Sequence, residues 1–189
     1  MTTSVTTEKR TLKVKLATPD SVAPYGQILG PNANVKPLPI DFYGGSVSVR
    51  RVVDFISDEQ TEMPLVTVNR RPMEVRWMER HFKHTQTFIP LAGSPFVVVM
   101  APPNDKELPD LDKVEALLFD GSAGLTMRIG TWHEFPFPLK DNSNLIVILR
   151  REATEGLMKD NVVQDEALSP DLDKKDLQAR KRVIFELQL

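Results

Sequence analysis

The chain has three histidines, His81, His84 and His133, and these are its best candidates for chemistry near neutral pH. An imidazole gains or loses a proton between pH 5 and 8, and it also binds metals. The three lie in two short stretches, EVRWMERHFKHTQTFIPLAG and GTWHEFPFP. A lone histidine is usually a surface or core residue, but this clustering favours a functional site.

The first stretch predicts two strands joined by a turn around Phe82 and Lys83. Side chains alternate between the two faces of a strand, so Glu79 and His81 share a face. If the second strand returns antiparallel to the first, Gln86 can join them inside a barrel. The alternative is an exposed face, on which charged and amide side chains need no function.

In the second stretch, Trp132 and His133 point in opposite directions if the chain is extended, so only one of them can face the inside of a barrel. Core packing is the expected role for at least two of the aromatic residues Trp132, Phe135 and Phe137. Trp132 is also a candidate for stacking on a bound ligand.

The elements that must position these residues are mostly strands. Apolar segments alternate with period two or form short β-branched runs, and Pro, Gly, Asn or Asp separates them every eight to twelve residues. A closed barrel or a double-sheeted jelly roll would remove the exposed edges of so many short strands. The predicted strands are Leu12 to Leu16, Tyr25 to Leu29, Ser46 to Phe55, Leu65 to Asn69, Glu74 to Arg80, Thr85 to Ile89, Phe96 to Ala101, Leu125 to Ile129, Leu145 to Leu149 and Val183 to Leu187.

Helical spacing of apolar residues predicts one helix, from Asp110 to Asp120. The stretch from Arg151 to Arg182 is mostly charged, with helix signals only from Asp171 to Arg182, and is expected to be a peripheral appendage. The predicted domains are therefore a barrel at residues 1–150 and a charged C-terminal extension at residues 151–189, packed on or beside it.

Composition excludes several classes of protein. Twenty-four basic and 26 acidic residues give a formal net charge of −2, so binding of nucleic acid is not expected. The absence of cysteine excludes disulfides and thiolate chemistry, and suits a reducing compartment. The longest apolar run, Phe96 to Ala101, is too short to cross a membrane, and the start MTTSVTTEKR has no apolar signal core, so we expect a cytoplasmic protein.

Two ordered motifs point to a known family. The pattern E-R-H-x-x-x-T-Q-x-F-I-P occurs at Glu79 to Pro90, and G-T-W-H occurs at Gly130 to His133. Between them lie a V-V-V run at Val97 to Val99 and P-D-L at Pro109 to Leu111. On these motifs the chain, from about Tyr25 to Leu149, resembles the ureidoglycolate lyases of allantoin catabolism, formerly called ureidoglycolate hydrolases.

This resemblance implies a cupin-like β-barrel, commonly a homodimer, that splits ureidoglycolate into glyoxylate and urea as part of purine degradation. It also implies that Asn69 and Arg70, in the VNR segment before the first motif, lie near the pocket.

Ureidoglycolate is a carbinolamide that carries a carboxylate. Its elimination needs a base for the hydroxyl proton, an acid for the departing urea nitrogen and a cationic anchor. We expect His81 or Glu79 to be the base and His133 the acid. Arg70 could anchor the carboxylate, and the amide of Gln86 would bind the ureido group.

A cupin can also hold a divalent metal, and His81, Gln86 and His133 occupy plausible ligand positions. An amide oxygen is a poorer ligand than the carboxylate that metal cupins usually offer there. The sequence does not distinguish nickel, manganese and zinc, or establish that a metal is required.

The chain departs from the family pattern at three places. Phe82 stands where proline usually follows the first histidine, Met127 and Arg128 stand where a tyrosine and often a histidine are common, and proline comes later than usual, at Pro136. If Arg128 faces the pocket, it could bind a second carboxylate or favour a different acid. Alternatively, one of Met127 and Arg128 points outward and nothing changes.

Three functions compete. The first is the lyase, and the second is a non-catalytic cupin that binds or senses a small carboxylate. The third is a metal-dependent cupin isomerase or oxygenase. Turnover of ureidoglycolate and its sensitivity to a chelator would distinguish them.

Overall fold

The computed structural model describes residues 6–40, 43–58, 60–159 and 165–189, and most of these residues with regular structure lie in strands. The helices are α1 (Pro19–Val22), α2 (Arg151–Lys159) and α3 (Leu177–Lys181), with 3₁₀ turns at Tyr43–Gly45 and Leu111–Lys113. The strands are β1 (Glu8–Leu16), β2 (Gly26–Leu29), β3 (Thr61–Glu62), β4 (Leu65–Val68), β5 (Glu74–Val75), β6 (Trp77–Arg80), β7 (Gln86–Pro90), β8 (Phe96–Ala101), β9 (Glu115–Phe119), β10 (Gly124–Met127), β11 (Trp132–His133), β12 (Phe137–Pro138), β13 (Ser143–Arg150), β14 (Ala167–Ser169), β15 (Leu172–Asp176) and β16 (Val183–Gln188).

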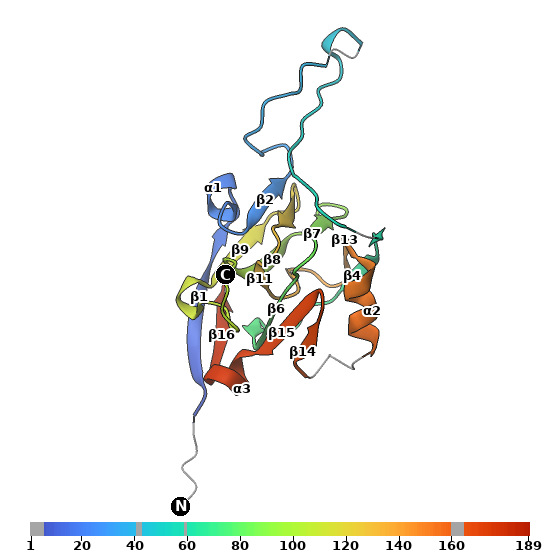
Figure 1. Cartoon of the computed structure of the whole chain (residues 1–189). Helices are drawn as coiled ribbons and strands as arrows, with labels where there is room; N and C mark the ends of the chain where they lie inside the picture. Colours follow the sequence, from blue (N-terminus) through green and yellow to red (C-terminus); the bar gives the residue numbers. More distant parts are fainter. Residues whose placement is uncertain (1–5, 41–42, 59, 160–164) are drawn as a thin grey trace, which may run out of the picture.

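Within the described residues, these strands form two sheets. The larger has the order β14-β15-β6-β11-β8-β9-β1-β16-β5, with β12 also paired to β8. The smaller has the order β2-β10-β7-β13-β3, with β4 also paired to β13. Figure 1 shows the strands curled around the centre of the molecule. The predicted mostly β fold, a cupin-like barrel, is confirmed.

Strand β8 explains why the sequence carries an unbroken apolar run. All its residues are buried. Val98 and Met100 pack in one apolar cluster, whereas Val97 and Val99 pack in another on the opposite face. Successive side chains of a strand point to opposite faces, so a strand with a core on both sides needs apolar residues throughout.

The strand predicted over Ser46 to Phe55 is wrong. These residues are all described, they form no regular strand, and most are exposed. They belong to an arm that extends away from the barrel (Figure 1), where neither sheet offers its edge. The Leu38 amide donates a hydrogen bond to the Val49 carbonyl, but such isolated contacts do not make a strand of an alternating sequence. Each of the other predicted strands overlaps a strand of the structure.

The helix predicted over Asp110 to Asp120 is also wrong. The segment forms a 3₁₀ turn at Leu111–Lys113 and then strand β9, which pairs with β8 on one side and β1 on the other. The Asp110 side chain caps the turn by accepting a hydrogen bond from the Asp112 amide. A short apolar run fits a helix or a buried strand equally well by periodicity, and here the two neighbouring strands decide.

The helix signals from Asp171 to Arg182 are correct only at Leu177–Lys181, because Leu172–Asp176 forms β15. Strand β15 pairs with β6, and β16 pairs with β1. The chain after residue 150 therefore contributes strands to the larger sheet, while the proposed domain division at that residue stays a prediction.

A further observation concerns the helices. In the part of the chain that the structure describes, none is long and apolar enough to cross a membrane.

Candidate functional site

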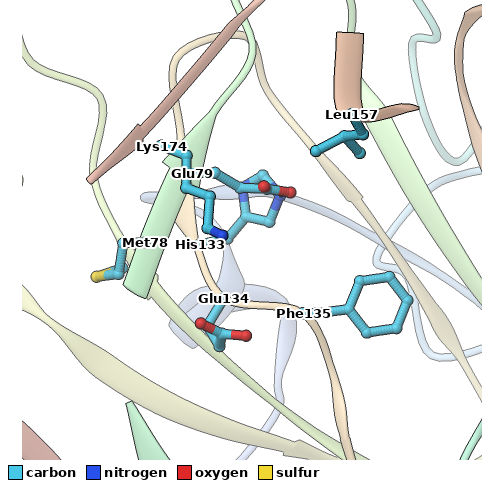
Figure 2. Close-up of a pocket in the computed structure, with 7 residues that line it drawn as sticks. All are labelled: Met78, Glu79, His133, Glu134, Phe135, Leu157 and Lys174. Atoms are coloured by element: carbon cyan, nitrogen blue, oxygen red, sulfur yellow. The ribbon is translucent and has the colours of Figure 1, made fainter. Parts of the chain in front are cut away.

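Three neighbouring strands bring a carboxylate, an imidazole and an ammonium group together. Glu79 lies on β6, with His133 of β11 opposite it on one side and Lys174 of β15 opposite it on the other. Residues directly opposite in an antiparallel pair project from the same face, with their Cβ atoms about 4.5–5.5 Å apart. The three side chains thus form one row across the sheet, which Figure 2 shows.

This row lies in the wall of a cavity of about 430 Å³, a size that suits a small ligand. The cavity is open to solvent, and its lining mixes charged and apolar groups. The lining residues are Met78, Glu79, His133, Glu134, Phe135, Leu157 and Lys174.

Each of two histidines points its Nε2 atom at Glu79. Its Oε1 lies 3.5 Å from Nε2 of His133 and 3.9 Å from Nε2 of His81. The Nδ1 atoms lie 3.0 Å from backbone carbonyls, that of His81 from Asp171 and that of His133 from Thr131. A carbonyl only accepts hydrogen bonds, so Nδ1 carries the proton in both rings and Nε2 of each neutral ring is an acceptor.

The site therefore has room for a proton or a cation. Within the described residues, both Nε2 atoms are buried without a hydrogen-bond partner. Lone pairs that face a carboxylate repel it unless a proton or a positive ion lies between them. Glu79, His81 and His133 also form a group whose ligand atoms lie within 4.8 Å of one another, as a metal site requires.

Burial and neighbouring charges set the protonation of these groups. Burial lowers the pKa of His81 to about 4, and the attraction of Glu79 opposes this only in part. Burial would raise the pKa of Glu79, but the contact with His133 and the charges of His133, His81 and Lys174 outweigh it, so the pKa lies below its usual value. Near neutral pH, the site holds an ionised Glu79 and a neutral His81.

The third histidine belongs to a second cluster behind the first. Nδ1 of His84 lies 2.8 Å from Oδ2 of Asp171, and the rings of His84 and His81 are 4.5 Å apart. Asp171 is fully buried, and its Oδ1 accepts hydrogen bonds from the backbone amides of Phe82 and Lys83. Asp171 thereby holds the turn that follows β6 and carries His81 and His84.

The antiparallel pair that could place Gln86 beside Glu79 does not form. Strand β6 pairs with β11 and β15, whereas β7, which carries Gln86, pairs with β10 and β13 in the smaller sheet. Gln86 is buried, and its Oε1 atom has no hydrogen-bond partner among the described residues. Trp132 is fully buried among apolar residues, with the Arg80 guanidinium 4.2 Å above its ring.

None of the five candidate substrate-binding residues is among the described residues that line the cavity, and three of them have other contacts. Asn69 accepts a hydrogen bond from the Asn142 amide, and Arg70 forms a mostly exposed ion pair with Asp141. Arg128 is exposed and donates a hydrogen bond to the carbonyl of Ala23.

The arginine that reaches the site is instead Arg71. Its guanidinium lies 3.0 Å from Glu134 and donates hydrogen bonds to the carbonyls of Phe135 and Pro136. Burial lowers the pKa of Arg71, and Glu134 opposes the effect. Burial also raises the pKa of Glu134, and Arg71 again opposes it.

Sequence patterns did not single out Lys174, Glu134 or Leu157. Lys174 lies in the charged run DLDKKD, and only the register of β15 against β6 places it beside Glu79. Leu157 approaches from helix α2 (Figure 2). Adjacency to His133 was the one available signal for Glu134, but a regular strand would turn Glu134 to the opposite face.

Comparison with known proteins identifies the family of this chain. A curated ureidoglycolate lyase of Pseudomonas paraeruginosa is 28% identical over 176 residues, covering 84% of this chain and 95% of the relative. One of Burkholderia mallei is 28% identical over 167 residues, covering 86% and 95%. One of Azotobacter vinelandii is 38% identical over 82 residues, covering 43% and 48%. Residues 9–171 match the family described as ureidoglycolate lyase, and the chain therefore belongs to the ureidoglycolate lyase family.

Proposed function

We propose that this protein cleaves the C–N bond of ureidoglycolate and releases glyoxylate and urea. The observation that carries the proposal is the placement of an ionised Glu79 against two imidazole Nε2 atoms at the wall of the cavity, in a chain of this family. The arrangement supplies both proton transfers that the elimination needs.

Glu79 is the base in this proposal. Its carboxylate takes the hydroxyl proton of the substrate, and the oxygen lone pair forms the new C=O bond. Glu79 passes this proton to Nε2 of His133, which is free to accept it. The C–N bond breaks, its electrons pass to the urea nitrogen, and Nε2 of His133 donates the proton to that nitrogen. The 3.5 Å between Oε1 of Glu79 and Nε2 of His133 is the path of this transfer, and both groups end the reaction as they began it.

Two observations favour Glu79 over His81 as the base. Glu79 lines the cavity, whereas His81 is almost completely buried and does not. The Nε2 atom of His81 also faces Glu79, 3.9 Å from Oε1, while the lowered pKa of Glu79 keeps that carboxylate ionised. His81 positions Glu79 in this proposal.

The remaining candidates stay predictions. Gln86 can bind the ureido group if its unpartnered amide oxygen reaches the substrate. Substrate binding is also predicted for Asn69, Arg70, Trp132 and Arg128. The contacts that these residues make in the structure do not place them in the cavity.

The donor set also fits a divalent metal. Glu79, His81 and His133 would hold it, with buried Nε2 atoms that lack hydrogen-bond partners in the described part of the chain. Gln86, predicted as a ligand, has an equally unpartnered oxygen. A bound nickel, manganese or zinc ion would supply Lewis acidity to the substrate oxygens.

The test is to incubate the purified protein with racemic ureidoglycolate, with and without chelator and added metals, and to measure glyoxylate and urea above the spontaneous rate. We expect turnover. Binding of glyoxylate without any turnover, under every metal condition, would instead support the carboxylate-sensing alternative. If a chelator abolishes turnover and one added metal restores it, that metal is the cofactor.

A homodimer, a cytoplasmic location and a place in allantoin and purine degradation complete the proposal. The projecting arm exposes apolar side chains, including Tyr43 at 85%, Ile40 and Val47, which a second copy of the chain could cover. Light scattering of the intact protein tests the dimer, and a mass of about one chain would contradict it.

The absence of cysteine suits a reducing compartment, and imaging of the tagged chain in its host tests the location.

A further inference from the structure

We propose that Lys174 of strand β15 binds the substrate carboxylate and makes the site selective for ureido acids over neutral ureido alcohols. The inference rests on the proposed function and deepens it. It gives the C-terminal segment, which the sequence patterns left without a role, a part in substrate recognition.

The register of the sheet places Lys174 at the reacting groups. Lys174 is directly opposite Glu79 in the β15–β6 pair, and Glu79 is directly opposite His133 in the β6–β11 pair. All three residues line the same cavity. Figure 2 shows the Lys174 side chain extended along the cavity wall beside Glu79 and His133. A carboxylate held by Lys174 would put the adjacent carbinol carbon next to the proposed base and acid.

The distribution of charge favours Lys174 as the anchor. Among the described residues that line the cavity, it is the only lysine or arginine. The nearby arginines Arg70, Arg71 and Arg80 are not among the described residues that line the cavity. An anionic substrate must approach Glu79, and a cation beside that carboxylate offsets the repulsion.

The surroundings of Lys174 keep its side chain near the cavity. Its Nζ lies 4.5 Å from the centre of the Trp77 ring, within the range of a cation–π contact. The side chain is half-buried, and burial lowers its pKa while Glu79 and Glu134 oppose the shift. A substrate carboxylate would add negative charge in a partly desolvated place, where a charged contact is stronger than in bulk water.

The family match ends at residue 171, so Lys174 lies just beyond the part of the chain that the family describes. The catalytic candidates Glu79 and His133 lie inside the match. The proposal for Lys174 therefore rests on the geometry of this chain and not on the family match.

The test crosses one substitution with two substrates. Ureidoglycolate carries the carboxylate, whereas N-(hydroxymethyl)urea has the same carbinolamide without it and would release formaldehyde and urea. For Lys174→Met we expect kcat/KM for ureidoglycolate to fall about 10- to 100-fold, the range for loss of a hydrogen bond to a charged group. For N-(hydroxymethyl)urea we expect a change of less than about threefold, because it lacks the group that Lys174 binds.

Two variants serve as controls. Lys174→Arg keeps the positive charge and should recover most of the lost activity. Lys181→Met removes the same charge from an exposed position at the end of α3 and should behave like the wild type. Equal losses with both substrates in Lys174→Met would overturn the proposal, because they would show a structural role.

A binding measurement makes the test independent of the second substrate. Glycolate has the carboxylate and hydroxyl but no ureido group, and its inhibition constant should rise about tenfold in Lys174→Met. An unchanged constant would overturn the role of Lys174 alone. Failure of the wild-type protein to cleave ureidoglycolate under any metal condition would overturn the proposed function itself.

Discussion

The molecule holds two carboxylate–imidazole clusters side by side, and they are built differently. In the cavity, Glu79 lies 3.5 Å and 3.9 Å from the Nε2 atoms of His133 and His81. Behind it, Asp171 lies 2.8 Å from Nδ1 of His84 and accepts two backbone hydrogen bonds. The first cluster is loose and reaches the cavity, whereas the second is tight and closed.

The difference separates a site that can transfer protons from one that holds the chain in place. Buried hydrogen bonds such as those that Asp171 accepts rigidify a structure, although Nε2 of His84 has no hydrogen-bond partner among the described residues. A carboxylate whose neighbours are just beyond hydrogen-bond distance can instead receive a proton or bind a ligand. Since His81 contacts both clusters, Asp171 and His84 support the position of His81 beside Glu79.

The largest effect on activity should come from Glu79→Gln. Loss of the proposed base should lower kcat about 10²- to 10⁴-fold, while the urea midpoint of unfolding stays close to that of the wild type. Steady-state glyoxylate formation and urea unfolding measure the two. Glu155→Gln, an exposed change on α2, is the matched control. Near-normal activity in Glu79→Gln would remove Glu79 from the mechanism.

A substitution in the closed cluster of Asp171 and His84 should instead lower the free energy of unfolding. Asp171→Ala leaves the amides of Phe82 and Lys83 and the His84 imidazole without their acceptor, which should cost about 3 kcal/mol of unfolding free energy. Urea unfolding measures the loss, with Asp112→Ala, at an 89% exposed side chain, as the control. A fully stable but inactive variant would show that Asp171 acts in catalysis rather than in holding the turn.

The contributions of the two clusters to the free energy of unfolding should be lost at different pH. The pKa of folded His81, about 4, is below its ordinary value of 6.5, so its neutral form favours folding above pH 6.5 and this contribution is lost as pH falls towards 4. The pKa of Asp171 lies below its ordinary 3.8, because the contacts with His84 and the Lys83 amide outweigh burial, so its contribution is lost only at lower pH.

Urea midpoints between pH 7 and pH 4 test this for the wild type and for His81→Gln. The wild type should lose stability steadily through that range, and the variant should lose less because it has no imidazole to protonate there. An equal slope in both proteins would mean that other groups cause the loss. Below pH 3.8 the two curves should steepen together.

The smallest expected effect concerns Arg128, the departure from the family pattern that suggested a different substrate. Its exposed position and contact with Ala23 lead us to expect less than about a twofold change in kcat/KM for Arg128→Ala. Steady-state kinetics with ureidoglycolate measure it. A loss as large as that of Lys174→Met would bring Arg128 into the binding site after all.

Much of the fold and part of the site follow from local sequence. Period-two alternation predicted most of the strands, and it also predicted that Glu79 and His81 would project together, as they do. Arg80, which stands between them in the sequence, pairs with Asp173 on the other side of the strand. Alternation is a property of the strand itself, so no partner needs to be known.

The family motifs identified the three residues that meet at the cavity and its rear wall. Glu79, His81 and His133 come from two motifs about fifty residues apart, and the resemblance alone indicated that they converge. Their side-chain chemistry follows from the sequence. Their separation, tautomers and protonation do not, because burial and neighbouring carbonyls determine these.

Tertiary structure alone decided the rest. The apolar run at β9 became a strand because β8 and β1 flank it, and the arm around Ser46 did not because no strand lies beside it. Lys174 reached the cavity only through the register of β15, and a slip of one residue would have turned it away. Local sequence sets residue types and strand periodicity, but long-range pairing chooses the neighbours of each strand, and those neighbours complete the site.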